Sequence, residues 1–120
     1  MITVRPRNQV DLMFRAFSDR TRLRILHILR AGELCVGDLV GILRVPQAKT
    51  SRHLGYLRRA GLVQVREEGL WCFYSLAAPQ NPFHKKLIEC LAVCFSDVPE
   101  IGQDECRADK VRKGGGCCPK

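Results

Sequence analysis

The chain has 120 residues, enough for one domain with a modest core, and 46% of them are hydrophobic, which is typical of a globular protein and excludes a disordered one. Twenty Lys and Arg against twelve Asp and Glu give a net charge of +8, so we expect an acidic partner, with nucleic acid ahead of a membrane surface. No membrane span or secretory signal is visible, so we expect a cytoplasmic protein whose seven cysteines serve thiol or metal chemistry rather than a disulfide framework.

Two amphipathic helices are predicted in the first quarter of the chain. Apolar residues at helical spacing predict a helix over 10–17, with Asn8 as its cap. Ser18 or Asp19 would cap a second helix over 20–30, which the Ala31-Gly32 pair would end. We expect both helices to serve as scaffold.

The stretch from Cys35 to Gly61 predicts two short helices joined by a tight turn. The residue before a proline is biased away from the α region, so Arg44-Val45-Pro46 ends the first helix. Pro46 suits the start of the second, because its missing N–H is not needed there. In that second helix Thr50, Leu54 and Leu57 share one face, which we expect to be buried.

The opposite face of this second helix is suited to DNA. From Leu39 through Arg66 there are six basic residues and no carboxylate. Basic and small polar side chains can read base edges or hold phosphates, whereas an ordinary solvated helix is the alternative interpretation. The residues expected to bind DNA are Gln47, Lys49, Thr50, Ser51, Arg52, His53 and Arg66.

After Gly61 the hydrophobic period changes from 3.6 to 2, which predicts a β-hairpin around the turn Glu67-Glu68-Gly69. A hairpin directly after a helix-turn-helix is a wing that can lie along the DNA backbone. The two carboxylates at its tip do not attract phosphate, so Arg66 is the better contact there, and a purely structural hairpin remains the alternative.

A final helix is predicted over 83–95, with a long apolar stripe that suggests packing against a second copy of the chain. The expected dimer-interface residues are Phe83, Leu87, Leu91 and Phe95. Beyond Ser96 the apolar residues thin out and charges balance. We therefore divide the chain into a DNA-binding and dimerisation domain, 1–95, and a flexible cysteine-containing tail, 96–120.

Four stretches, AFSDRTRLRILHIL, GELCVGDLVGIL, TSRHLGYLRRAGLV and EGLWCFYSL, together resemble the ArsR/SmtB family of metal-sensing repressors. The resemblance spans roughly residues 10 to 95. It implies a mainly α fold with a small β-hairpin, a winged helix-turn-helix, assembled as a homodimer. It also implies a non-enzymatic repressor that binds a palindromic operator in double-stranded DNA and is released by an inducer.

The chain departs from two inducer sites of this family. Arsenite sensors of the ELCVCDL type carry cysteines two residues apart, whereas here Cys35 is followed by Gly37 and Val40 where further thiols would be expected. One thiol cannot chelate an ion, so this site is set aside. Zinc-sensing members use Asp and His pairs on the last helix, but His84 stands alone there.

The thiols near the C-terminus remain as inducer ligands. Thiolates select soft ions, and three convergent cysteines suffice to bind trivalent arsenic or antimony. We expect Cys106, Cys117 and Cys118 to bind such an ion, with Cys90 and Cys94 as the alternative and no organic cofactor. Another thiophilic metal (cadmium, lead or zinc), a small thiol-redox protein and a non-specific architectural nucleic-acid binder are the competing interpretations.

Overall fold

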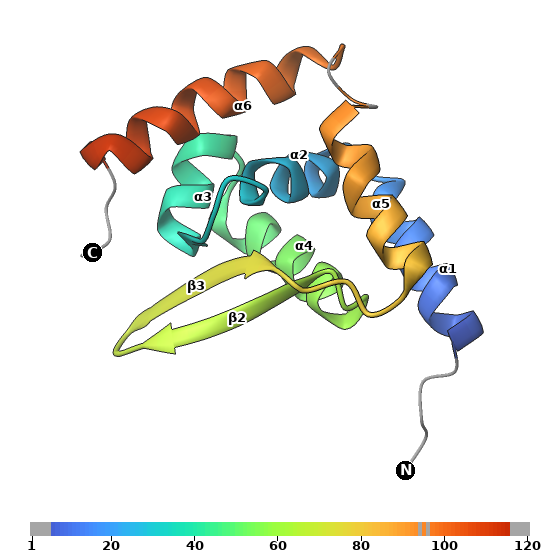
Figure 1. Ribbon diagram of the computed structural model, residues 1–120. Coiled ribbons are helices and arrows are strands. Elements are labelled where there is room, and N and C mark those ends of the chain that lie inside the picture. Colours follow the sequence, from blue (N-terminus) through green and yellow to red (C-terminus); the bar gives the residue numbers. More distant parts are fainter. Residues whose placement is uncertain (1–5, 94, 96, 116–120) are drawn as a thin grey trace.

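The computed structural model describes residues 6–93, 95 and 97–115. In chain order its elements are α1 (Pro6–Phe17), α2 (Arg20–Leu29), β1 (Leu34–Cys35), α3 (Val36–Leu43), α4 (Gln47–Arg59), β2 (Val63–Glu68), β3 (Trp71–Leu76), α5 (Pro82–Val93) and α6 (Pro99–Lys110). One further helical turn follows, Val111–Gly115. The helices surround α2, α6 lies across α2 and α3, and the β2–β3 hairpin projects from the group (Figure 1).

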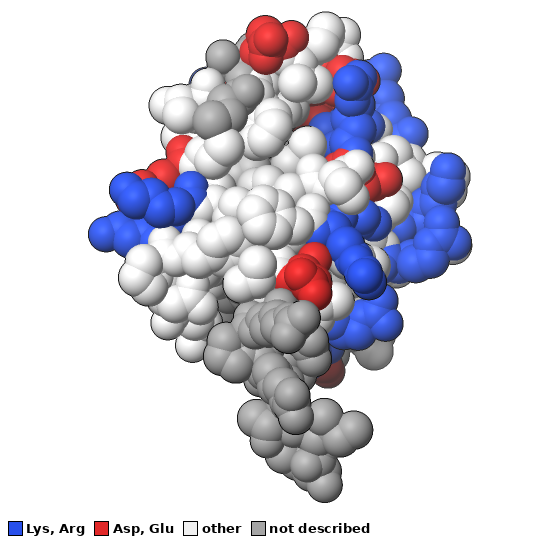
Figure 2. All heavy atoms as spheres, turned by 90° about the vertical axis from the view of Figure 1, so that its right-hand side faces the viewer, with Lys and Arg blue, Asp and Glu red and all other residues white. Residues whose placement is uncertain are grey.

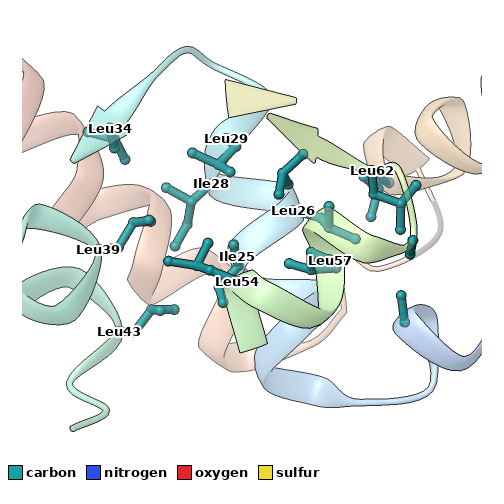
Figure 3. Close-up of a cluster of buried hydrophobic side chains, with 14 of the residues drawn as sticks. Ile25, Leu26, Ile28, Leu29, Leu34, Leu39, Leu43, Leu54, Leu57 and Leu62 are labelled. Carbon is teal, nitrogen blue, oxygen red and sulfur yellow. The ribbon is translucent and has the colours of Figure 1, made fainter. Parts of the chain in front are cut away.

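The core lies where α2, α3 and α4 meet (Figure 3). Leu54 and Leu57 point inward from α4 and are fully buried, as are Ile25 and Leu26 of α2. Burying a side chain of this size contributes about 1.5–3 kcal/mol, so these contacts fix α4 against the scaffold. The helix predicted over 20–30 and the two helices predicted between Cys35 and Gly61 are confirmed.

The ends of these helices follow the local sequence signals. Asp19 caps α2, because its side chain accepts a hydrogen bond of 3.0 Å from the Arg22 backbone N–H. At the end of α3 the Arg44 backbone takes a left-handed conformation with φ of 58°, and α4 begins directly after Pro46. The first helix starts earlier than expected, at Pro6, so Asn8 lies inside α1 and is not its cap.

The sheet has three antiparallel strands in the order β1-β3-β2. The expected hairpin is confirmed, but β2 runs on to Glu68, which pairs with Trp71, so the turn is Gly69-Leu70. Gly69 has φ of 61°, a conformation that glycine adopts without a steric penalty. The two-residue strand β1 was not predicted, because two residues are too few to show a period; it pairs with the far edge of β3.

The expected flexible tail from residue 96 is wrong for residues 99–115, because this segment forms α6 and the turn after it. Pro99 opens the helix, and Ile101, Asp104 and Ala108 are buried against the rest of the molecule. The even balance of acidic and basic residues suggested that this segment is solvated. Some of these charged residues instead form buried ion pairs, which hold α6 against the rest of the molecule. Residues 116–120 lie outside the described part of the chain.

That network joins α6 to α2 and to the end of α3. The Arg24 guanidinium binds both oxygens of Asp104, at 2.7 and 2.9 Å, and donates to the carbonyl of Leu43 at 2.8 Å. Arg107 also donates to Asp104, at 3.0 Å, and to the carbonyl of Ile42 at 2.6 Å. Two arginines therefore satisfy the last carbonyls of α3, where an α-helix has no internal donors.

The arrangement of α2 to α4 followed by the hairpin is a winged helix-turn-helix, as expected from the sequence. None of the helices within the described residues is long and apolar enough to cross a membrane.

Candidate nucleic-acid interface and thiol positions

The outward face of α4 is exposed and cationic. Gln47, Lys49, Ser51 and Arg52 are all exposed, as the sequence predicted for DNA-binding residues. Among the described residues no carboxylate forms an ion pair with Lys49 or Arg52. Their charges are therefore available to an external anion.

Thr50 is a correction, because it was expected among the DNA-binding residues. It is fully buried, and its hydroxyl lies 3.3 Å from the Val45 carbonyl, to which it donates. The signal that could have excluded it was its helical spacing to Leu54 and Leu57, which share its buried face. Thr50 secures the turn before α4 and cannot contact DNA directly.

His53 is half-buried and turned toward the corner between α1 and α2. Its Nδ1 lies 3.5 Å from Nη1 of Arg22 and 3.9 Å from Oδ2 of Asp19. Burial lowers its pKa, an effect that the nearby Asp19 opposes. Arg22 also stacks over the Tyr56 ring at 4.2 Å and donates to the Ala16 and Arg15 carbonyls at 3.1 and 2.8 Å. These contacts fix the orientation of α4 on the scaffold.

Three arginines of α4 line a shallow hollow in the surface. Arg52, Arg58 and Arg59 surround Gly55, where nothing lies within 4 Å of the position a Cβ would occupy. A phosphate group fits the chemistry of such a hollow, since arginine presents several donors to an anion. Arg58 and Arg59 were absent from the expected DNA-binding residues, although the acid-free run from Leu39 to Arg66 contained them.

The wing arginine has its own carboxylate partners. Arg66 bonds Glu33 at 2.7 and 3.1 Å and Glu68 at 2.6 Å, and its guanidinium lies 4.5 Å from the centre of the Phe73 ring. The hydrogen bonds to Glu33 and Glu68 raise its pKa, and that to Arg66 lowers the pKa of Glu33. Its side chain is still 51% exposed, so it reaches solvent with its charge largely compensated.

The expected dimer residues on α5 separate into two groups. Phe83, Leu87 and Phe95 are partly exposed, and the Phe83 ring packs 5.2 Å from that of Phe14 on α1. Leu91 is a correction, because it is only 1% exposed and belongs to the core. Figure 2 shows the side of the molecule formed by α1 and α5: its centre is uncharged, and Lys and Arg lie at its margins.

The cysteines lie in different surroundings. Cys106 is exposed and lines a hollow of about 490 Å³ together with His27 and Arg30. His27 is buried there, with Nδ1 3.1 Å from Oε1 of Glu105 but without the alignment of a hydrogen bond, and burial lowers its pKa. Cys90 is half-buried on α5, whereas Cys94, Cys117 and Cys118 lie outside the described residues.

Cys35, which the sequence analysis set aside, is buried at the start of α3. Its sulfur accepts a 3.4 Å hydrogen bond from the Asp38 backbone N–H and so caps the helix. Cys35 is also disulfide-bonded. In the part of the chain that the structure describes, no three His, Cys, Asp or Glu side chains gather as a metal site.

Comparison with known proteins places the chain among bacterial regulators. Residues 19–65 match the family described as "Bacterial regulatory protein, arsR family". The arsenic resistance transcriptional regulator ArsR1 of Pseudomonas putida is 46% identical over 84% of this chain and 74% of its own length. The arsenical resistance operon repressor of Escherichia coli is 41% identical over 81% of this chain and 88% of its own. A cadmium resistance regulatory protein CadC homolog of Staphylococcus aureus is 36% identical, over 79% and 78%.

Solved structures agree with the fold. HlyU from Vibrio cholerae superimposes with a TM-score of 0.64 at 34% identity, over 77% of this chain and 99% of its own. A homodimeric winged helix-turn-helix DNA-binding domain from Mycobacterium bovis, Mb0332, gives a TM-score of 0.62 at 25% identity, over 78% and 86%. These relatives are named as transcription regulators and DNA-binding domains, not as enzymes.

Proposed function

Since this chain belongs to the arsR family of bacterial regulatory proteins, we propose that it is a transcriptional repressor that binds a palindromic operator as a dimer and leaves it on binding a trivalent metalloid. The observation that carries the DNA-binding half of this proposal is the exposed cationic face of α4. Family membership excludes the alternative of a thiol-redox enzyme.

The DNA-reading residues in this proposal are Gln47, Lys49, Ser51 and Arg52. They lie on the exposed side of a helix whose other side is locked into the core by Leu54. A major groove admits a helix, and Arg and Gln are suited to guanine and adenine edges. Arg58 and Arg59 would hold phosphates at the end of the same helix, which is a positioning role and not a base-reading one.

Dimerisation is proposed through α1 and α5. Phe14 is 57% exposed and Val93 is 72% exposed, and both belong to the helices that form the uncharged face in Figure 2. A contiguous exposed apolar patch with charged residues at its margins marks an interaction site, whereas single exposed apolar side chains do not. The related Mb0332 domain is described as homodimeric, which supports the same assembly here.

The dimer contact can be tested without disturbing the core. Phe14→Asp combined with Val93→Asp should leave a folded monomer in sedimentation velocity and weaken operator binding, because two linked half-sites are lost. Leu91 is unsuitable for this purpose, since its buried position means that a charge there would unfold the chain. A double variant that remains dimeric would move the interface elsewhere.

The inducer is proposed to be trivalent arsenic or antimony bound by cysteine thiolates. Two relatives carry arsenic resistance in their names, which supports a metalloid, whereas the CadC homolog makes cadmium the second candidate. The vicinal pair Cys117-Cys118 would supply two sulfurs, with Cys106 as the third ligand expected from the sequence. Cys90 with Cys94 is the alternative pair.

The test is a release experiment with the reduced full chain and an operator duplex taken from the DNA upstream of its own gene. Fluorescence anisotropy should report release by arsenite and antimonite at concentrations where zinc and cadmium leave the complex intact. Release by cadmium alone would transfer the sensor role to that metal. Operator binding that no ion alters would refute the inducer part while leaving DNA binding standing.

A further inference from the structure

We propose that Arg107 of α6, which Asp104 aligns, is a positioning residue for operator binding, because it holds the turn that leads into the DNA-reading helix α4. Arg107 acts on DNA only through this turn and does not contact the operator itself. The inference rests on the proposed function, and it adds to the residues that read the operator one that sets their position.

The start of α4 carries the DNA-reading residues but has no side-chain cap of its own. In a helix-turn-helix the first residues of the second helix reach the base edges. Here those residues are Gln47, Lys49, Ser51 and Arg52, all near the start of α4. Pro46, which precedes the helix, makes no side-chain cap hydrogen bond. The position of this helix end therefore depends on the turn before it.

Thr50 joins the start of α4 to that turn. Its hydroxyl donates to the Val45 carbonyl at 3.3 Å, and its backbone N–H donates to the Pro46 carbonyl at 3.0 Å. Leu54 and Leu57, by contrast, bury the later part of the helix. A shift of the turn is therefore passed directly to the DNA-reading residues, which lie on the same stretch of α4 as Thr50.

The turn has a backbone conformation that requires support from other elements. Arg44 has φ of 58° and ψ of 39°, in the left-handed region that residues other than glycine seldom adopt. Such a conformation persists where surrounding contacts determine it. The two carbonyls just before Arg44 receive these contacts, because Leu43 accepts from Arg24 at 2.8 Å and Ile42 accepts from Arg107 at 2.6 Å. These bonds fix the last turn of α3, from which the chain turns toward α4.

Asp104 aligns both donors. Its carboxylate accepts from Arg24 at 2.7 and 2.9 Å and from Arg107 at 3.0 Å, and the residue is only 1% exposed. A guanidinium is planar, so bonds to Asp104 also fix the direction in which each arginine donates to α3. In this way α6 supports the turn between α3 and α4 from the side away from DNA.

An ion pair that only docks α6 on α2 is the alternative role for this network, and the same two helices contain such a pair. Arg20 of α2 and Glu100 of α6 are 3.1 Å apart and partly exposed. Within the described residues this pair makes no bond to α3, whereas Arg107 does. Breaking each contact in turn therefore separates the docking of α6 from the support of the turn.

The test compares Arg107→Met with Glu100→Gln and Lys113→Ala in the full chain. Arg107→Met keeps an apolar stem and loses the donor to Ile42. Glu100→Gln breaks a contact between α2 and α6 that does not reach α3, and Lys113→Ala removes one exposed positive charge. Substitutions between two sites that touch neither ligand change their coupling about 2- to 30-fold. Arg107→Met should weaken operator binding by a factor in this range, whereas the two controls should bind like the parent.

The salt dependence distinguishes positioning from direct contact. Loss of a phosphate contact weakens binding to all sequences and lowers the salt slope by about 1. Arg107→Met should instead keep the parental slope and bind a scrambled duplex like the parent, because only the fit to the operator bases changes. Amide hydrogen exchange should be faster at the Thr50 N–H of this variant, which reports the start of α4. Urea denaturation identifies conditions in which both chains are fully folded.

Parental operator affinity in Arg107→Met would overturn the proposal, as would an equal loss in Glu100→Gln or a lowered salt slope. If Arg107→Met does not fold, Arg107→Lys takes its place with the same expectation, since lysine keeps the charge beside Asp104 but not the guanidinium that reaches two acceptors. A parent that binds operator and scrambled duplex equally would contradict the proposed function. Faster exchange at Thr50 in the variant would still support the role of Arg107 in that case.

Discussion

The arginines on α4 and those between α2 and α6 are the same residue type in opposite roles. On α4, Arg52 and its neighbours are exposed, and no acidic side chain of the described residues pairs with Arg52 or Arg58. Between α2 and α6, Arg24 and Arg107 share one buried carboxylate, Asp104, and also donate to backbone carbonyls of α3. The comparison teaches that positive charge alone does not identify a DNA-binding surface. An arginine proposed to bind DNA must also lack an internal carboxylate partner.

The largest expected effect comes from removing the shared carboxylate. Asp104 is 1% exposed, so Asp104→Asn leaves two guanidiniums without their counter-charge. We expect a loss of about 3 kcal/mol in the free energy of unfolding, the lower end for a broken buried pair because asparagine still accepts a hydrogen bond. Urea denaturation measures this. The control is Asp109→Asn, whose pair with Lys113 is exposed and should contribute about 0–1 kcal/mol. An equal loss of unfolding free energy in Asp104→Asn and Asp109→Asn would show that the buried ion pairs of Asp104 stabilise the fold no more than an exposed pair does.

The next effect concerns DNA and not stability. Arg52→Ala should weaken operator binding by about 1–3 kcal/mol and relax preference at one base pair, while unfolding in urea stays like the parent. Lys113→Ala, which removes an exposed positive charge away from α4, is the matched control. Unchanged affinity of Arg52→Ala, with an unchanged salt dependence, would show that this face of α4 does not read the operator.

A smaller effect is expected at the wing, where an exposed arginine is paired. Arg66 is held by Glu33 and Glu68, so Arg66→Ala should reduce operator affinity less than Arg52→Ala does. Anisotropy titrations of both variants at two salt concentrations make the comparison. A larger loss for Arg66→Ala would mean that DNA displaces the two glutamates and that the wing is a principal contact.

The smallest effect is a pH dependence from buried histidines. Burial lowers the pKa of His27, next to α6, and of His84, below the ordinary value of about 6.5. As the pH falls through about 6.5, the histidines of the unfolded chain bind protons before those of the folded chain. The free energy of unfolding is therefore highest above pH 6.5 and falls as the pH approaches the lower pKa values of the folded state. Urea midpoints at pH 7.5 and pH 5.5 should differ in this direction. His27→Gln should show a shallower slope, and an equal slope would exclude a contribution from His27.

The winged helix-turn-helix could be predicted from the sequence because the hydrophobic periods of its helices and strands are set by neighbouring residues. The i, i+4, i+7 spacing of Thr50, Leu54 and Leu57 and the period of 2 after Gly61 are each set within a few residues. The same spacing places Thr50 inside, so its inclusion among the DNA-binding residues contradicted a pattern already visible.

The missed features depend on residues far apart in the chain. Nothing near Asp104 indicates that Arg24, 80 residues earlier, neutralises it, so α6 was taken for a solvated tail. An apolar stripe on α5 does not reveal which of its residues faces a partner and which faces the core, and Leu91 faces the core. Cys35 was set aside because Gly37 and Val40 stand where further thiols were expected, and its role as the cap of α3 was not visible from that comparison.

The most direct test of a repressor released by a metalloid is reciprocal binding. Isothermal titration of arsenite into the reduced full chain, with and without saturating operator duplex, measures the coupling from the side of the ion. Linkage requires that operator weaken arsenite binding by the same factor by which arsenite weakens operator binding, which for typical coupling is about 5- to 150-fold. Equal arsenite affinity with and without the operator would contradict the account.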